Sequence, residues 1–350
     1  MRRLLFVVLL ATASATAGLV AAPAASAASS TTITLVTHDS FAVSKPVLAA
    51  FTKQTGITVK ILQAGDAGAA LNQVILTKSN PIGDVFFGVD NTLLSRALDQ
   101  GVFTKYAPAA LSTVPDEYQL DPSHRLTPID HGDVCINYDK QWFAKEKLAV
   151  PKSLDDLTEP AYKGRLVVEN PATSSPGLAF QLATIARYGE NGWRAYWSKL
   201  RANDVKVDDG WESAYDGDFS QGANHGTFPL VVSYASSPPA AVYYADPKPS
   251  TSPVGTMLDS CFRQVEFAGV LKGTEHQAAA RKLVDFMLSE RFQADVPLQM
   301  FVFPVRDGTP LPAVFTKFAQ VATKPLSLQP ADISAHRDAW IEQWTDTVLR

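Results

Sequence analysis

The class of fold is indicated by the stretch TITLVTHDSFAVSKPVLAAFTKQTGITVKIL, residues 32–62. Its apolar, β-branched start at 32–36 predicts a buried strand. A helix is expected from Pro46, a favoured first helical position, to Gly56, because the apolar residues between them follow helical spacing. The alternating residues 57–62 predict a second strand. A strand, a helix and another strand in this order are typical of a parallel sheet with helices on its faces.

This alternation continues through the chain. The pattern predicts further helices at 69–78, 92–101 and 176–202, and further strands at 84–89, 165–169 and 228–234. Asp90 and Asn91 precede the helix at 92–101 and are candidate N-caps. The repeated alternation predicts an α/β protein, and a length of 350 residues favours two lobes.

Two longer extended segments, 126–138 and 261–270, interrupt the alternation. Each contains one of the two cysteines, Cys135 and Cys261. In an exported chain a pair of cysteines favours a disulfide over two reactive thiols. If the two cysteines are bonded, the outgoing and returning segments lie side by side, and two crossing strands form a hinge between the lobes.

The last part of the chain is predicted to be mostly helical. Residues 276–296 have the pattern of one strong amphipathic helix, and an extended piece comes after it at 300–305. Near the C-terminus, Trp340 and Trp344 share one helical face. This face predicts a packing helix.

The N-terminus has the features of a secretory signal peptide. Arg2 and Arg3 precede an apolar run, and Ala25 to Ala27 form an A-x-A-like cleavage site. Removing residues 1–27 leaves 29 basic and 35 acidic residues, a net charge of −6. This mild acidity, without a basic patch, predicts no nucleic-acid partner. The six histidines lack the spacing of a structural zinc site, so no metal is expected.

The segment 207–239, VDDGWESAYDGDFSQGANHGTFPLVVSYASSPP, carries the strongest functional signal. Trp211 follows a turn, and a predicted strand ends at Ser233 and Tyr234. Ligand sites of open α/β sheets lie where strands end. Aromatic faces, hydroxyls and nearby carboxylates suit a flat, polar, cationic small molecule, because ring faces attract cations. Packing in the core is the alternative role for both aromatic residues.

Seven motifs give the chain a resemblance to a known family, and they span nearly all of it beyond the signal peptide. They are THDSF (37–41), GVDNTLL (88–94), NPATSSPGLAF (170–180), GWESAY (210–215), VVSYASSP (231–238), LVDFMLSERFQ (283–293) and AWIEQWTDTVLR (339–350). The chain resembles the thiamine-binding periplasmic proteins of ABC transporters. The resemblance implies the type II solute-binding fold, an α/β architecture of two lobes, each a mixed sheet flanked by helices, joined by a two-crossover hinge.

The resemblance implies how the chain is divided and what it does. Lobe 1 is expected at 32–130 and 262–320, lobe 2 at 131–261, and the packing helix within 321–350. The implied function is that of an exported, monomeric, non-catalytic receptor without a cofactor. It would capture thiamine or thiamine phosphates and deliver them to the membrane permease of an ABC importer.

The resemblance also implies ligand contacts. The matching positions are His38, Asp66, Ala67, Ser174, Ser175, Trp211, Tyr234, Ala235, Ser236, Ser237, Pro238 and Phe301. A cleft carboxylate at Asp66 would favour a thiazolium cation. Ser174 and Ser175 precede the helix predicted from Pro176, and hydroxyls and free N–H groups at a helix start suit a phosphate or serve as an ordinary cap. His38, Ala240 and Phe301 depart from the family pattern, which has tyrosine, tyrosine and tryptophan there.

Two alternatives stay open. Tyr243 and Tyr244 resemble the tyrosine pair of ferric-ion-binding relatives with the same fold. A thiaminase-like enzyme of this fold would need Cys135 or Cys261 as a cleft nucleophile. Charge-transfer colour with ferric ion and a free-thiol titration would separate these two from a thiamine receptor.

Overall fold

The structure of the protein, a computed structural model, describes residues 31–350. The predicted signal peptide at 1–27 lies outside the described residues. The strands are β1 (Thr31–Thr37), β2 (Ile57–Gln63), β3 (Val85–Asp90), β4 (Thr127–Asp139), β5 (Leu166–Glu169), β6 (Lys206–Asp208), β7 (Leu230–Tyr234), β8 (Val254–Val270) and β9 (Phe303–Pro304). The predicted strands are present, within a few residues at their ends.

The part of the molecule around β1, β2 and β3 is here called the first half, and the part around β5, β6 and β7 the second half. The helices of the first half lie in regions predicted to be helical, but α8 and α9 occupy a region that was expected to form one helix. They are α1 (Lys45–Thr55), α2 (Ala67–Leu76), α3 (Leu94–Asp99), α8 (Gln277–Met287) and α9 (Glu290–Gln299). The remaining helices are α4 (Lys140–Glu146), α5 (Ser175–Tyr188), α6 (Trp193–Ala202), α7 (Pro238–Tyr243), α10 (Ala313–Phe318) and α11 (Pro330–Val348).

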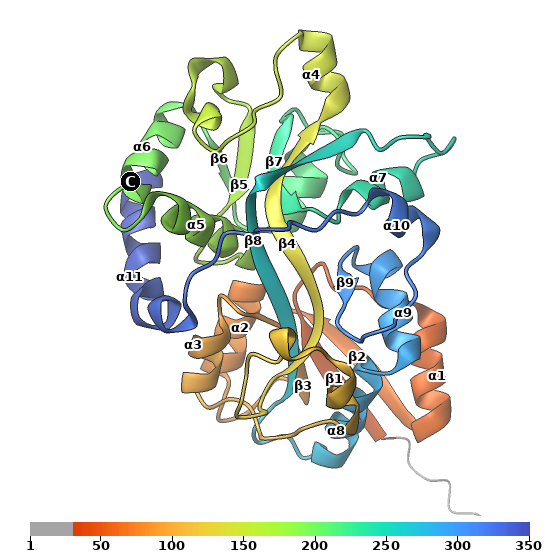
Figure 1. Cartoon of the computed structure of the whole chain (residues 1–350). Coiled ribbons are helices and arrows are strands. Elements are labelled where there is room, and N and C mark those ends of the chain that lie inside the picture. Colours follow the sequence, from red (N-terminus) through yellow and green to blue (C-terminus); the bar gives the residue numbers. More distant parts are fainter. Residues whose placement is uncertain (1–30) are drawn as a thin grey trace, which may run out of the picture. The chain divides into compact units, whose positions relative to one another are not determined.

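One sheet runs through both halves in the order β2-β1-β3-β8-β4-β7-β5-β6, and β9 adds to β4. The outer strands pair in parallel, β1 with β2 and β3, and β5 with β6 and β7. The long strands β4 and β8 pair antiparallel with each other and with their neighbours. Figure 1 shows β4 and β8 running side by side from the first set of strands to the second. The predicted two-lobed α/β fold with a two-crossover hinge is confirmed.

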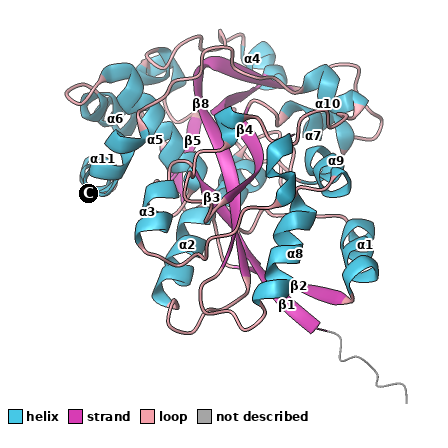
Figure 2. Cartoon of the chain, turned by 60° about the horizontal axis from the view of Figure 1, so that its bottom comes forward, coloured by secondary structure: helices cyan, strands magenta, loops and turns pink. Residues whose placement is uncertain are grey.

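Strands β1 and β3 have a layer of apolar core on each of their two faces. Leu35 and Phe87 pack in one cluster with residues of α1 and α8, whereas Val36 and Phe86 pack in another with residues of α2. Successive side chains of a strand point to opposite faces, so both faces must be covered. Figure 2 shows α2 on one side of these strands and α1 and α8 on the other.

Two expected long helices are each divided in the structure. The region 176–202 breaks between α5 and α6, where Gly189 takes a φ of +69°. The region 276–296 breaks between α8 and α9, where the Ser289 Oγ accepts the Phe292 N–H at 3.3 Å and caps α9. A left-handed glycine and a serine cap are local stop and start signals that outweigh a continuous apolar period.

Asp90 and Asn91 have different roles in the structure. Asp90 Oδ1 accepts the N–H groups of Thr92 and Leu93 in the turn before α3, but Leu93 is the N-cap of α3, so the prediction of Asp90 as N-cap is wrong. Asn91 instead bonds the backbone of β8, donating to the carbonyl of Arg263 at 3.1 Å and accepting the N–H of Val265 at 2.9 Å. The candidate capping role of Asn91 is therefore wrong, because pairing to β8 takes its side chain away from the helix.

The C-terminal helix α11 packs as its pattern predicts. Trp340, Trp344 and Val348 are buried on it. The helix contacts α6 in the second half and α3 in the first. Its apolar face therefore belongs to the core.

Candidate functional site

A cavity of about 990 Å³ lies within the described chain where the two halves meet. The first half contributes the loops that follow β1 and β2. The second half contributes the start of α5, residues of the segment 211–225, and α7. Residues 299–302, before β9, and residues within 244–253, after α7, also line the cavity. Small-molecule sites commonly have volumes of this order.

Eight of the twelve residues predicted as ligand contacts line the cavity, namely His38, Asp66, Ala67, Ser175, Trp211, Tyr234, Ser237 and Phe301. The other four lie behind its wall. Ser174 caps α5, because its Oγ accepts the N–H of Gly177 at 3.3 Å. Ala235 is buried against the two cysteines, and Ser236 and Pro238 are buried beside it in sequence. These four residues shape the wall from behind.

Asp66 joins both halves of the protein. Its Oδ1 accepts the N–H of Ala67 at 2.6 Å and the N–H of Ser175 at 3.2 Å, and its Oδ2 accepts the N–H of Trp211 at 2.9 Å. Burial raises the pKa of the Asp66 carboxyl above its ordinary value, against a lowering by the Trp211 N–H. One carboxylate therefore caps α2 and connects α2 to two segments of the second half.

The loops on either side of Asp66 approach each other closely. A Cβ atom at Gly68 would lie 2.6 Å from the carbonyl oxygen of Thr173. The same carbonyl accepts the N–H of Ala69 at 3.0 Å. A side chain at Gly68 would push the two halves apart, so glycine is needed there.

Trp211 forms part of an aromatic wall. Its ring stacks on that of Tyr215 with centroids 4.8 Å apart and planes 12° from parallel. Its Nε1 donates to the Oγ of Ser233 at 2.9 Å. The residue is half-buried and lines the cavity, so it is held in one orientation while part of it stays accessible.

Four side chains form a hydrogen-bonded network at the hinge strands, here called the polar floor: Tyr234, Gln264, Asp90 and Ser175. The Tyr234 hydroxyl donates to Gln264 Oε1 at 2.7 Å. Gln264 Nε2 donates to Asp90 Oδ2 and to the Ser175 Oγ, the latter at 3.1 Å. Burial raises the pKa of Asp90 to about 7, although hydrogen bonds from Thr92 and Gln264 oppose the rise. Because β3, α5, β7 and β8 each contribute one member, the network joins elements of both halves.

An ion pair lies beside the polar floor. His38 Nε2 is 3.2 Å from Glu266 Oε1, and both side chains are mostly buried. Burial, the largest single cause, would lower the pKa of His38, but the charge and hydrogen bond of Glu266, together with the charges of Asp66 and Asp39, outweigh it, and the net shift of the pKa is upward. Burial and the charge of Glu266 raise the pKa of nearby Asp130 well above its ordinary value.

The lining is acidic. Five carboxylates line the cavity, from Asp66, Glu212, Asp216, Asp246 and Glu266, and none of the described lining residues is lysine or arginine. Burial and the charge of Asp39 raise the pKa of Glu212, and burial raises the pKa of Asp216. Crowded carboxylates of this kind are stabilised by an incoming cation.

The mouth of the cavity carries three aromatic side chains, here called the aromatic rim: Tyr243, Tyr244 and Phe301. The Tyr244 ring is 5.1 Å from that of Tyr243 and 5.6 Å from that of Phe301, and the residue is 70% exposed. Phe301 takes a φ of +53°, which is unusual for a bulky residue. Of the two tyrosines, Tyr244 alone lines the cavity. Among residues 31–350, no group of three or more His, Cys, Asp or Glu side chains is arranged to hold a metal ion.

Several lining residues were not predicted from the sequence. Glu212 and Tyr215 stand in the quoted GWESAY motif, and their nearness to Trp211 is a signal that could have found them. Glu266 lines the cavity from β8, a strand that contains several polar residues, so no sequence pattern marks it for the site. Met300 and Asp246 line the cavity without a motif that marks them.

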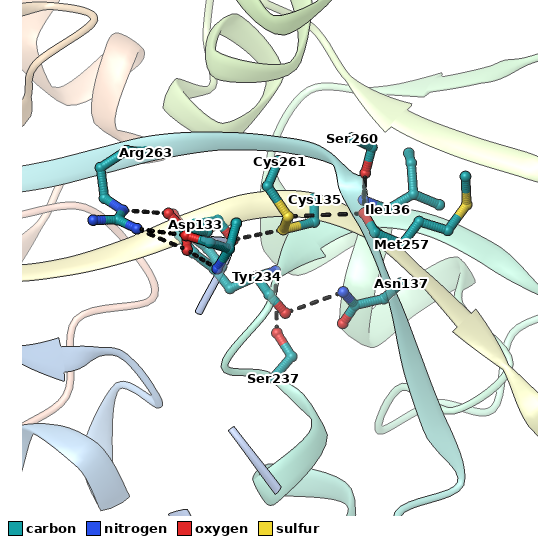
Figure 3. The surroundings of a disulfide bond; sticks show 11 residues. Asp133, Cys135, Ile136, Asn137, Tyr234, Ser237, Met257, Ser260, Cys261 and Arg263 are labelled. Atoms are coloured by element: carbon teal, nitrogen blue, oxygen red, sulfur yellow. Dashed lines mark hydrogen bonds and ion pairs between the residues drawn. A yellow bond between two sulfur atoms is a disulfide. The ribbon is translucent and has the colours of Figure 1, made fainter. Parts of the chain in front are cut away.

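Cys135 and Cys261 form a disulfide that joins the two hinge strands, as predicted. Figure 3 shows the bond between β4 and β8, beside the backbone of Tyr234. The strand register shifts here, since Val134 pairs with Phe262 but Ile136 pairs with Met257. Both cysteines are fully buried and neither is free, so the chain offers no thiolate nucleophile.

The segment after α10 covers the disulfide. Ala322 packs against both cysteines, and its N–H donates to Asp133 Oδ2 at 2.7 Å. Arg263 pairs with Asp133 and donates to the carbonyl of Ala322 at 3.2 Å. Figure 3 shows Arg263 and Asp133 facing each other beside the disulfide. These contacts therefore cover the disulfide on this side.

The fold and the cavity together define a class of protein. Two halves that are joined by crossing strands can close on a small molecule, and residues from both halves line the cavity between them. These are the features of a solute-binding protein.

Comparisons with known proteins agree with this class. The family model for bacterial extracellular solute-binding proteins matches residues 80–323. The thiamine-binding periplasmic protein of Escherichia coli K12 is 33% identical over 91% of this chain and 94% of its own. A solved periplasmic thiamin binding protein superposes with a TM-score of 0.78 at 29% identity, covering 91% of this chain and 96% of its own. The solved structure of iron-bound HitA from Pseudomonas aeruginosa is 23% identical and superposes with a TM-score of 0.69, covering 91% of this chain and 99% of its own. It shares the fold.

The chain belongs to the bacterial extracellular solute-binding protein family. It is a binding protein rather than an enzyme, and it is exported. Among residues 31–350, no helix has the length and apolar character needed to cross a membrane.

Proposed function

We propose that the chain captures thiamine and delivers it to the membrane permease of an ABC importer. The observation that carries this proposal is a cavity with five carboxylates, no lysine or arginine in its described lining, and a stacked pair of aromatic rings. Thiamine is a flat molecule with a cationic thiazolium ring and a polar aminopyrimidine ring. Carboxylates and aromatic faces are the groups that attract such a cation.

The relatives add support. The E. coli relative and the similar solved structure are both named for thiamine binding. In this chain, Trp211 and Tyr215 would offer a ring face to the ligand, and Asp66, Glu212 and Glu266 would balance its charge. Hydroxyls of Tyr234 and Ser237 would orient the aminopyrimidine by hydrogen bonds.

Delivery to a permease requires that the lobes open and close. We place lobe 1 at 32–130 and 262–320 and lobe 2 at 131–261, with β4 and β8 as the hinge. We also propose that the receptor acts as a monomer. Size-exclusion chromatography with light scattering tests the monomer, and small-angle scattering with and without ligand tests the closure.

Calorimetric titration with thiamine, ferric citrate and spermidine tests the proposal. We expect a saturable heat with thiamine and quenching of tryptophan fluorescence. Binding of another ligand without any heat from thiamine would overturn the proposal. Visible colour with ferric citrate would instead support the iron alternative, in which Tyr244 at the rim would be a ligand.

The variant Trp211→Ala separates a binding role from a packing role. Loss of a ring that faces a cation should weaken thiamine binding by about 2- to 30-fold, which corresponds to about 0.5 to 2 kcal/mol. The variant W142A removes another half-buried tryptophan away from the cavity lining and serves as the control. Unchanged affinity in W211A together with a large loss of stability would assign Trp211 to packing.

A further inference from the structure

Given the proposed function, we infer that closure of the two halves takes up a proton at Glu169, a buried carboxyl behind the cavity wall. The step beyond the proposed function is a residue that couples closure to pH. Within the described chain, Glu169 is not one of the residues that line the cavity. It is a positioning residue, because it acts through the segments that bring Ser175 and Trp211 to Asp66.

Glu169 is enclosed by elements of the second half. It is the last residue of β5, is fully buried and pairs with Asp208 of β6. Alternate side chains of a strand share a face, so Glu169 lies on the same face of β5 as Val167, which packs with Trp211. The start of α5 presses on it as well, since a Cβ atom at Gly177 would lie 3.0 Å from Glu169 Cβ.

The carboxyl of Glu169 lacks any group that would stabilise its charge. Neither of its oxygens has a hydrogen-bond partner among residues 31–350, and the Oδ2 of Asp208 is buried without one as well. Lys206, on the same face of β6, lies 3.4 Å from Asp208 Oδ1 and also pairs with Asp218. A buried carboxylate without donors costs far more than a neutral acid. Glu169 is therefore held as a neutral acid.

The charges that act on Glu169 come from both halves. Burial raises the pKa of Glu169 well above its ordinary value, and the charges of Asp66 and Asp208 raise it further. Burial and neighbouring Asp218 raise the pKa of Asp208 itself to about 6. Tyr215, from the segment that packs on β5, stays a neutral phenol because burial raises its pKa. Asp66 is the member of this set that belongs to the first half.

Asp66 makes contacts that closure has to form. Its carboxylate accepts the N–H groups of Ser175 and Trp211, which follow the ends of β5 and β6 in the chain. When the halves separate, Asp66 moves away, and Glu169 loses part of its burial together with a neighbouring negative charge. The pKa of Glu169 then falls toward its ordinary value. Closure raises this pKa again, so the closed form holds more protons and ligand affinity falls as pH rises.

Calorimetric titration of the exported chain with thiamine, in buffers of different ionisation enthalpy, measures the protons exchanged on binding. At about pH 7 the wild type should take up about 0.5 proton or more per thiamine beyond Glu169→Gln, which cannot titrate. Over each pH unit between about 6 and 8, the thiamine dissociation constant should therefore rise about threefold more in the wild type than in E169Q. Other titrating groups, including Asp66 and thiamine itself, contribute to both proteins and cancel in the difference.

A matched variant controls for the loss of one carboxyl. Glu342→Gln, at an exposed position on α11, makes the same change away from the cavity and should keep the wild-type proton uptake. Equal uptake by the wild type and E169Q would overturn the inference and leave the proposed function standing. Absence of thiamine binding by the wild type would instead overturn the proposed function.

Infrared spectroscopy provides a second measurement on the wild type alone. A neutral carboxyl has a carbonyl stretching band that is separate from the bands of a carboxylate, and thiamine should increase this band. An unchanged band on thiamine binding would contradict proton uptake. The amide of E169Q matches the neutral acid in shape and charge. Failure of E169Q to fold or to bind thiamine would therefore contradict the neutral state of Glu169.

Discussion

The polar floor and the aromatic rim differ in how their side chains are held; Ser175 and Tyr234 of the floor and Tyr244 and Phe301 of the rim line the cavity itself. On the floor, Gln264 is buried and bonds three partners, so each side chain depends on the others. At the rim, Tyr244 is 70% exposed and packs against two other aromatic rings. A change in the floor would therefore alter both the shape of the cavity and the stability of the fold. The rim side chains, by contrast, can move when a ligand binds with little effect on stability.

The largest expected effect on stability comes from removing the disulfide between the hinge strands. The double variant C135A/C261A removes a cross-link between residues 126 positions apart in sequence. We expect the free energy of unfolding to fall by about 2 to 5 kcal/mol, because a long loop is no longer closed in the unfolded chain. Urea denaturation of both proteins measures the difference. An unchanged midpoint would mean that the packing of Ala322 and the Asp133–Arg263 pair alone hold the hinge strands together.

The next effect tests the floor directly. Gln264→Met keeps the volume but leaves Asp90, Tyr234 and Ser175 without their shared partner, so stability should fall by about 2 to 3 kcal/mol. Gln100→Met, at an exposed position, should change stability by less than about 0.5 kcal/mol. Thermal unfolding of both variants compares them. Equal stability of the two would show that the network contributes nothing net and that the contrast between floor and rim is wrong.

The floor also predicts a pH dependence. The pKa of Asp90 is about 7 in the folded chain, against 3.8 as its ordinary value. Between these values the folded chain holds a proton that the unfolded chain has released, so this contribution to stability falls as pH rises. Relative to Asp90→Asn, which cannot titrate, the wild type should lose up to about 1.4 kcal/mol per pH unit between about pH 4 and 7.

Denaturation of wild type and D90N at about pH 5, 6, 7 and 8 measures this trend. The exposed variant D99N on α3 controls for the loss of one negative charge. Two results would contradict the raised pKa of Asp90: a difference in unfolding free energy between wild type and D90N that stays constant with pH, or one that shifts in favour of the wild type as pH rises.

The smallest effect belongs to the rim. Tyr244→Ala should leave stability within about 0.5 kcal/mol of the wild type, because the side chain is mostly exposed. Thiamine affinity should fall about 2- to 5-fold, which corresponds to an exposed cation–aromatic contact of about 0.5 to 1 kcal/mol. Tyr244→Phe keeps the ring and should bind as the wild type does. Loss of binding in Y244F would point to the hydroxyl, and so to metal ligation.

Sequence patterns located most of the fold and part of the cavity. The strands at 32–36 and 84–89 could be predicted because apolar, β-branched runs tend to be buried whichever elements come next in the chain. The disulfide could be predicted from the cysteine count and the expected export. The breaks at Gly189 and Ser289 were missed because a continuous apolar period hides a local stop signal.

The residues of the candidate site were likewise only partly predictable from the sequence. Trp211 and Tyr234 could be named from motifs and Asp66 from the family resemblance, whereas Gln264 and Glu266 could not be named. Their strand alternates between faces, and whether a polar residue on it meets solvent or a network depends on the partners opposite. Those partners come from β3, α5 and β7.

Residues that are close in the chain were enough to establish the α/β alternation, the crossing segments, the cysteine pair and an aromatic, acidic segment at 207–239. The tertiary structure was needed to show that Asp66 meets Trp211 across 145 positions and that its carboxylate takes the N–H of Ser175. Contacts at such separation depend on how two halves meet, and local periodicity carries no information about that. The charge balance of the cavity is therefore a property of the folded chain.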